Sequence, residues 1–196
     1  MEYEGWSRHK IHKNYLNQTS FPLNMILKLM LQSLYFFLPA YLANMSPVLF
    51  RFIPWGSQPI NEKWFGEHKT WRGLIIAPLI SSLIFGLQKF SFQEGFVDLA
   101  IIDYADFSLL LGFLLGLGAI LGDLVKSFFK RRRGLQPGER WLFWDQLDFV
   151  MGGLILGSFI YVPKVEVVLI LIAASPILHI ITNHLGYWLR IRDVKW

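Results

Sequence analysis

The chain has 196 residues, of which 54% are hydrophobic and 17% charged, and its formal net charge is +5. Soluble domains carry about 25% charged residues, so this composition and a mean hydropathy of +0.40 favour a membrane protein. The absence of cysteine excludes disulfides, thiolate chemistry and cysteine-ligated metals. The basic residues stand at the ends of apolar runs, which favours contact with phosphate groups and membrane surfaces over nucleic acid.

A polar segment, residues 1–24, precedes the apolar part of the chain and shows no secretory signal pattern. We interpret it as a lead-in, and residues 25–196 as a single membrane domain. The first uncharged run, Leu29–Phe50, is long enough to span a bilayer as a helix, since about 20 residues suffice. Pro39 predicts a kink, and Asn44-Met45-Ser46-Pro47 is expected to close the helix. Asn44 either needs a polar partner inside the protein or simply caps the helix end.

A loop, Arg51–Arg72, follows and contains several proline and glycine breakers. It ends in the string GEHKTWRG, in which Lys69 and Arg72 would face the same way on a helical first turn. Thr70 is suited to cap that turn or to bind a phosphate oxygen. Basic residues beside a membrane helix are more often anchors, so this segment does not by itself indicate a site.

The next two uncharged runs, Gly73–Gln88 and Phe107–Gly122, have 16 residues each. Such a run covers about 24 Å of a roughly 30 Å hydrocarbon core, so both helices are expected to extend into their charged flanks. Between them, Lys89–Asp106 carries four acids and one lysine, which indicates an outer-face loop with a short interfacial helix around Val97–Ile102. Spaced glycines in the third run predict close helix packing: Gly112, Gly116, Gly118 and Gly122.

The continuation of the third helix places four polar residues on one face. Asp123, Lys126, Ser127 and Lys130 stand at i, i+3, i+4 and i+7. An acid that faces inward beside lysines at the end of a membrane helix is a functional candidate. The alternative is a structural Asp–Lys pair that staples the helix end.

A further helix opens at Asp145-Gln146-Leu147-Asp148, after the basic cluster and a glycine- and proline-containing turn. Two carboxylates three residues apart are suited to bridge Mg²⁺, which prefers oxygen ligands and substrate phosphates. Acids also favour a helix start, so capping explains one of them. This fourth run ends near Pro163. In the last run, Val167–Leu189, His179, Asn183 and Tyr187 form a polar ladder, for which an internal hydrogen-bond seam is the simpler interpretation.

Together these runs predict an all-α polytopic membrane protein with about five transmembrane helices and a polar active site at the cytoplasmic face. The segments assigned to the inner side hold 13 of the 19 basic residues: Arg51–Arg72, Lys126–Arg140 and the C-terminal tail. The positive-inside bias therefore places the polar stretch in the cytoplasm, although four basic residues before the first span argue the other way.

Five strings occur together in the chain: AYLANMSPVLF, GEHKTWRG, GDLVKSFFKRRRG, DQLDFVMGGLILG and HIITNHLGYWL. From about Ala40 to Trp196, their order and spacing resemble the CDP-archaeol synthase family of membrane cytidylyltransferases, relatives of the phosphatidate cytidylyltransferases. The resemblance implies transfer of CMP from CTP to a lipid phosphate, of archaetidic-acid type or phosphatidic acid, with Mg²⁺ as cofactor. Its partners would be CTP, a lipid phosphate and the bilayer, not nucleic acid. The glycine pairs leave an oligomer open.

The resemblance also implies roles for individual residues. Asp123, Asp145 and Asp148 would bind Mg²⁺ and organise the phosphates, and with Lys130 they form the catalytic group. The expected substrate-binding residues are Asn44, Lys69, Thr70, Arg72, Lys126, Ser127, Arg131, Arg132, Gln146, His179 and Asn183.

Two other classes of protein are the alternatives to a cytidylyltransferase. CDP-alcohol phosphotransferases and aromatic prenyltransferases resemble longer acidic motifs that do not occur here. A non-enzymatic lipid transporter or lipid-binding protein is the remaining alternative, and such transporters often show internal repeats, of which we find none.

Overall fold

The computed structural model describes residues 25–136, 139, 141, 144–188 and 190. The predicted lead-in, residues 1–24, and the last residues of the basic tail lie outside the described residues. The described elements are all helical, and four of them are long and apolar enough to cross a membrane. These four are α2 (Met25–Leu49), α4 (Trp71–Gln93), α5 (Leu109–Arg132) and α7 (Val165–Trp188).

Three of these helices differ in extent from their apolar runs. Both α4 and α5 extend into charged flanks, as their short runs predicted, and α5 continues ten residues past Gly122 to Arg132. The first helix does not close at Pro47, because α2 continues to Leu49 with Pro39 and Pro47 inside it. Proline lacks an amide donor, so each proline removes one helical hydrogen bond without ending this long apolar helix.

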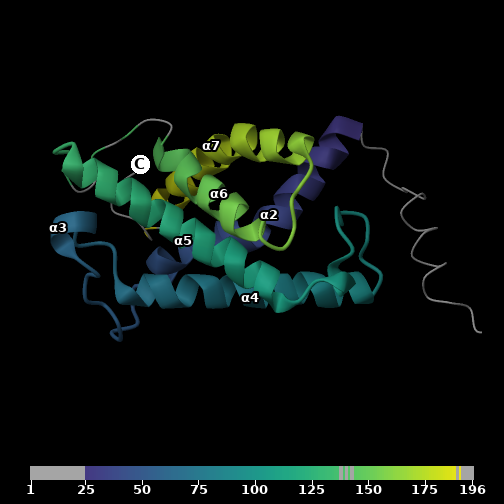
Figure 1. Cartoon of the computed structure of the whole chain (residues 1–196), viewed down its shortest axis with the longest axis horizontal. Coiled ribbons are helices and arrows are strands. Elements are labelled where there is room, and N and C mark those ends of the chain that lie inside the picture. The colour runs from purple at the N-terminus through teal and green to yellow at the C-terminus, as the bar shows by residue number, and fades with distance from the viewer. Residues whose placement is uncertain (1–24, 137–138, 140, 142–143, 189, 191–196) are drawn as a thin grey trace, which may run out of the picture.

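The fourth predicted span is α6 (Trp144–Gly157), which has 14 residues. At 1.5 Å per residue it covers about 21 Å, less than a bilayer core. Figure 1 shows that α6 and the turn after it return the chain to the end of the bundle where α7 begins. The segment α3 (Glu62–Phe65) and the C-terminal end of α5 lie at the opposite end (Figure 1).

The acidic loop between α4 and α5 has no helix at Val97–Ile102, where turns replace the expected interfacial helix. Its helical part is η1 (Tyr104–Asp106), for which Asp103 accepts a hydrogen bond from the Ala105 amide as N-cap. A short Asx cap of this kind stabilises a tight turn rather than a longer helix.

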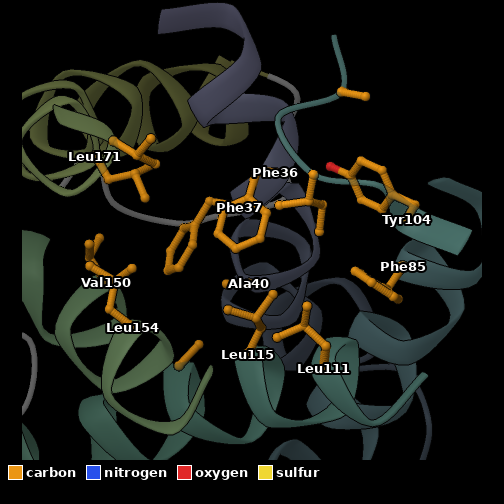
Figure 2. Packing of buried hydrophobic residues seen from close by; sticks show 14 of the residues in the cluster. Phe36, Phe37, Ala40, Phe85, Tyr104, Leu111, Leu115, Val150, Leu154 and Leu171 are labelled. Carbon is orange, nitrogen blue, oxygen red and sulfur yellow. The ribbon is translucent and has the colours of Figure 1, made fainter. Parts of the chain in front are cut away.

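The core lies where α2, α4, α5 and α6 meet (Figure 2). Phe36 and Phe37 of α2 are almost fully buried against Phe85, Leu115 and Val150 from the other three helices. Helices in lipid gain little from burying apolar groups, so close van der Waals packing must hold them together. The glycines of α5 provide that closeness, since Gly112 and Gly116 pack directly against side chains of α4.

Candidate active site

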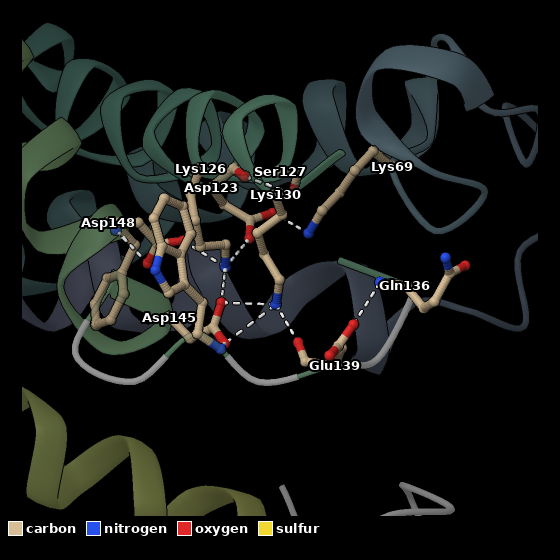
Figure 3. A network of polar contacts seen from close by, with 11 residues as sticks. Lys69, Asp123, Lys126, Ser127, Lys130, Gln136, Glu139, Asp145 and Asp148 are labelled. Carbon is tan, nitrogen blue, oxygen red and sulfur yellow. Dashed lines mark hydrogen bonds and ion pairs between the residues drawn. The ribbon is translucent and has the colours of Figure 1, made fainter. Parts of the chain in front are cut away.

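A polar cluster lies at the end of the bundle where α5 ends and α6 begins. Figure 3 shows lysines of α5 pointing toward carboxylates at the start of α6, with Lys69 approaching from the loop before α4. The predicted face of α5 is confirmed, because Ser127 and Lys130 are buried and Lys126 is 13% exposed. Residues that are far apart in the sequence therefore form one site.

Lys126 is the centre of this cluster. Its Nζ lies 3.0 Å from Asp123 Oδ1, 2.7 Å from Asp148 Oδ2 and 3.4 Å from Asp145 Oδ1. The first carboxylate belongs to the same helix and the other two to α6, so one ammonium joins two helices. Asp148 is only 5% exposed, and a carboxylate buried to that degree requires a positive partner.

Lys130 and Asp145 form the second part of the cluster. Lys130 Nζ lies 3.1 Å and 3.2 Å from the two oxygens of Asp145 and also donates to the Glu139 carbonyl. The Trp141 amide donates to Asp145 Oδ2 at 2.7 Å. Asp145 therefore lies in the first turn of α6, holds the segment before that helix through the Trp141 amide, and at the same time pairs with two lysines.

Lys69 reaches the cluster from a segment 54 residues earlier than its partner Asp123. Gly66 adopts φ 87, in the left-handed region that favours glycine, and so turns the chain from α3 toward Lys69. Thr70 is the N-cap of α4 and accepts from the Gly73 amide at 3.3 Å. Of the two roles expected for Thr70, the structure shows the helix cap.

Close backbone contact between α5 and α6 sets the separation of the carboxylates. A Cβ at Gly122 would overlap the Asp148 carbonyl oxygen, and one at Gly118 would overlap that of Gly152. Because Gly122 directly precedes Asp123, this contact brings Asp123 and Asp148 within reach of the same ammonium. The spaced glycines therefore place the site as well as packing the helices.

A cavity of about 110 Å³ adjoins the cluster. It is lined on one side by residues 65–69 and on the other by α5 residues Lys126, Ser127, Lys130 and Arg131. The buried Nε of Arg131 has no hydrogen-bond partner within the described part of the chain. Four cations around one small cavity, including this unpaired guanidinium nitrogen, define a place for an anion with several oxygens, such as a phosphate chain.

The two carboxylates of α6 differ in acidity. Burial raises the pKa of Asp145, but the Trp141 amide and the two lysines outweigh it and hold that pKa below its ordinary value. Burial, together with the Asp123 charge, raises the pKa of Asp148 to about 6, against the opposing effect of Lys126. Asp145 is therefore a stable anion, whereas Asp148 shares with two other acids the one cation that lies close to it among the described residues.

Other predicted residues lie at the margin of the cluster or outside it. Arg72 is buried and donates to the carbonyls of Arg51 and Ile53, so it faces the preceding loop instead of sharing a direction with Lys69. The reason is that α4 starts at Trp71, and Lys69 precedes the helical turn on which a shared face was expected. Arg132 is exposed and lies over the Phe128 ring at 5.1 Å.

The remaining residues expected to bind substrate lie on three helices. Asn44 is half-buried on α2, and Gln146 is half-buried on α6 between the two aspartates. On α7, Asn183 is buried and the His179 ring stacks on Phe149 at 6.4 Å. Phe149 follows Asp148, so this stack connects the α7 ladder to the cluster.

Several contacts at the site are not among those expected from the sequence. Glu67 and His68 line the cavity, and the Glu139 carbonyl and the Trp141 amide hold Lys130 and Asp145. The polar residues directly after Gly66 were the available signal for the cavity wall. Backbone groups carry no signal in the sequence.

Whether the cluster suits a divalent cation depends on its donors. Three carboxylates supply the hard oxygen ligands that Mg²⁺ takes, and they converge on one cation, the Lys126 ammonium. Among the residues that the structure describes, no three acidic or histidine side chains are arranged to hold a metal ion. The donors therefore match Mg²⁺ in kind, and in this structure they converge on the Lys126 ammonium.

Membrane helices with lysines, aspartates and an anion-sized cavity at one end define a membrane enzyme that acts on phosphate compounds. Comparison with known proteins narrows this class. A family model described as CarS-like CDP-archaeol synthase matches residues 26–196. The chain therefore belongs to the CDP-archaeol synthase family, and the resemblance seen in the sequence is confirmed.

Individual relatives agree with this assignment. The CDP-archaeol synthase of Thermofilum pendens is 36% identical over 84% of this chain and 80% of its own length. That of Thermococcus onnurineus is 36% identical over 88% of this chain and 100% of its own length. A solved structure, described as an intramembrane enzyme for archaeal membrane lipids biosynthesis, matches 76% of this chain and 91% of its own with a TM-score of 0.61 and 26% identity.

Proposed function

We propose that the cluster around Lys126 transfers CMP from CTP to the phosphate of an archaetidic-acid-type ether lipid, giving a CDP-lipid and pyrophosphate. Membership of the CDP-archaeol synthase family supports the reaction. The observation that supports the site is the meeting of Asp123, Asp145 and Asp148 with the cavity lined by Lys69, Lys130 and Arg131. These cations are suited to hold a triphosphate, and the site lies at the end of helices that are long and apolar enough to cross a membrane.

In this reaction the protein mainly positions the substrates and neutralises their charge. A lipid phosphate oxygen forms a bond to the α-phosphorus of CTP, and the bond from that phosphorus to the β-phosphate oxygen breaks. The released pyrophosphate carries away the electron pair. A phosphate monoester has its second pKa near 6, so it is ionised at neutral pH and needs no protein base. Phosphoryl-type transfer of this kind depends mainly on positioning and neutralisation of charge.

Each group of residues has a task in this scheme. Lys69, Lys130 and Arg131 hold the triphosphate through the cavity and offset the charge that develops on the leaving pyrophosphate. Asp123, Asp145 and Asp148 would hold Mg²⁺. When bound, this ion supplies charge neutralisation and orientation of the phosphate oxygens. Thr70 and Arg72 support the loop that carries Lys69.

Further proposals concern orientation in the membrane and the remaining residues. We place the cluster on the cytoplasmic side, where the positive-inside bias puts it and where CTP is available. Asn44, Gln146, His179 and Asn183 would line the lipid or cytidine pocket beside the cluster. Family membership does not favour the alternative of a non-enzymatic lipid-transport protein.

The test uses purified protein in detergent with Mg²⁺ and labelled CTP. Unsaturated archaeal ether lipid phosphate and phosphatidic acid are offered separately, and pyrophosphate release and lipid-borne label are followed. We expect label on the ether lipid only. Label on phosphatidic acid alone would refute the proposed acceptor, and failure to bind CTP would refute the enzyme mechanism.

A further inference from the structure

Lys126 occupies the point on which the three carboxylates of the cluster converge. Its ammonium lies within 3.4 Å of an oxygen of each one. Lys69 and Lys130 hold the outer sides of Asp123 and Asp145. Three lysines therefore balance three aspartates, and the cluster is formally neutral without any ligand.

Because the cluster is formally neutral, it does not favour the binding of either a divalent cation or a triphosphate alone. A divalent cation that arrives alone meets carboxylates already neutralised and an ammonium of its own sign between them. A triphosphate that arrives alone meets lysines already paired with carboxylates. Each ligand by itself would leave buried charge without a partner, which is costly in a site shielded from water.

The Lys126 side chain can reach a second position if the carboxylates bind a metal ion. The cavity that adjoins the cluster is lined by Lys126 itself, together with Lys69, Lys130 and Arg131. A lysine ammonium sits on a flexible four-carbon stem, so rotation of the side chain moves its charge from the carboxylates toward that cavity. A triphosphate in the cavity would receive it there.

We propose that Lys126 is an exchangeable counter-ion that makes the metal and the triphosphate bind together. The inference rests on the proposed function. With no nucleotide, Lys126 neutralises the carboxylates and keeps divalent cations out. When both ligands arrive, the metal replaces Lys126 at the carboxylates and Lys126 pairs with the phosphates. It is a positioning residue in this role, because it sets the coupling between two ligands.

The coupling can be measured without turnover. Mn²⁺ binding to the purified protein in detergent is followed by electron paramagnetic resonance, with no nucleotide present. In Lys126→Met the carboxylates lose their counter-ion, so we expect Mn²⁺ to bind about tenfold more tightly than in the wild type, within the usual range of coupling between sites. Lys164→Met is the matched control, since Lys164 is an exposed residue before α7, and should bind Mn²⁺ as the wild type does.

A second measurement uses the reciprocity of coupling, by which the metal must raise the affinity for CTP as much as CTP raises that for the metal. Binding of labelled CTP is compared with and without Mg²⁺, in the absence of lipid acceptor. In the wild type we expect Mg²⁺ to raise CTP affinity about tenfold or more, and in Lys126→Met the increase should largely disappear.

Removal of a buried cation can unfold a protein, so thermal unfolding accompanies both measurements. Mg²⁺ alone should raise the melting temperature of Lys126→Met and leave that of the wild type unchanged. Lys126→Gln, which keeps a donor but no charge, serves in its place if the methionine variant does not fold.

The outcomes separate the inference from the proposed function. Equal Mn²⁺ binding by the wild type and by a folded, uncharged Lys126 variant would overturn the exchange of counter-ions while leaving cytidylyl transfer intact. A wild type that binds neither CTP nor Mn²⁺ in either combination would overturn both.

Discussion

Alanine at Gly122 should damage the site through the backbone alone. An added Cβ would overlap the Asp148 carbonyl oxygen and lie 2.9 Å from its carbon, 0.5 Å short of the 3.4 Å at which ordinary contact begins. The obstructing atoms are backbone, so no side chain can rotate to make room. The helices α5 and α6 must therefore separate by at least that distance, which moves Asp123 away from Asp148.

Two effects follow from this separation. Overpacking costs about 1–3 kcal/mol of stability. A shift of about 1 Å at reacting groups lowers rates by about a hundredfold, so we expect turnover to fall at least about tenfold for a shift of half that size. Lys126 would lose its simultaneous contact with carboxylates on two helices.

The assay combines CTP-dependent labelling of lipid with thermal unfolding in detergent. Gly86→Ala is the matched control, because it is the same substitution in a membrane helix and its added Cβ would meet only the end of a leucine side chain, Leu109 Cδ2, at 3.3 Å. That variant should keep nearly wild-type turnover and stability. Wild-type turnover in Gly122→Ala would refute the argument that backbone contact sets the carboxylate spacing.

Three further outcomes can be checked with the same preparations. Asp148→Asn should lower turnover by about a hundredfold or more while thermal unfolding shows a folded protein, and near wild-type turnover would remove this acid from the mechanism. Binding of CTP in the presence of Mg²⁺, measured without lipid acceptor, should weaken as the pH drops through about 6, because Asp148 in the free protein, whose pKa is raised to about 6, then takes up a proton and loses its charge; equal affinity at pH 5 and pH 7.5 would contradict this. Tyr41→Phe removes the 2.6 Å hydrogen bond to Ser175 that joins α2 to α7, and should cost about 0.6 kcal/mol of stability, measured by thermal unfolding, with unchanged stability as the contrary result.

The sequence could predict much of the local structure of the site. Helical periodicity placed Asp123, Lys126, Ser127 and Lys130 on one face of α5, and the structure confirms that these residues face inward. The short apolar runs required α4 and α5 to extend into charged segments, which they do. Periodicity and length are properties of a single helix, so they can be derived from consecutive residues.

The family could also be identified from sequence, because its strings are made of residue types in a fixed order. The order of these sequence strings does not predict the length of every helix. The fourth run contained enough apolar residues to suggest a span, yet α6 ends after 14 residues at Gly157. The turn after Gly157 is stabilised by backbone hydrogen bonds, such as that of the Tyr161 amide to the Gly157 carbonyl, which no hydropathy pattern specifies.

Only the tertiary structure decided how the charged groups pair. Lys69 meets Asp123 across 54 residues, Arg72 turns to loop carbonyls, and Lys126 stands among three carboxylates. Charge and spacing identify groups that are able to pair, but the choice of partner depends on how closely two helices approach. Here that approach is set by backbone contact at glycines, a three-dimensional property of the packed helices that neither sequence segment carries alone.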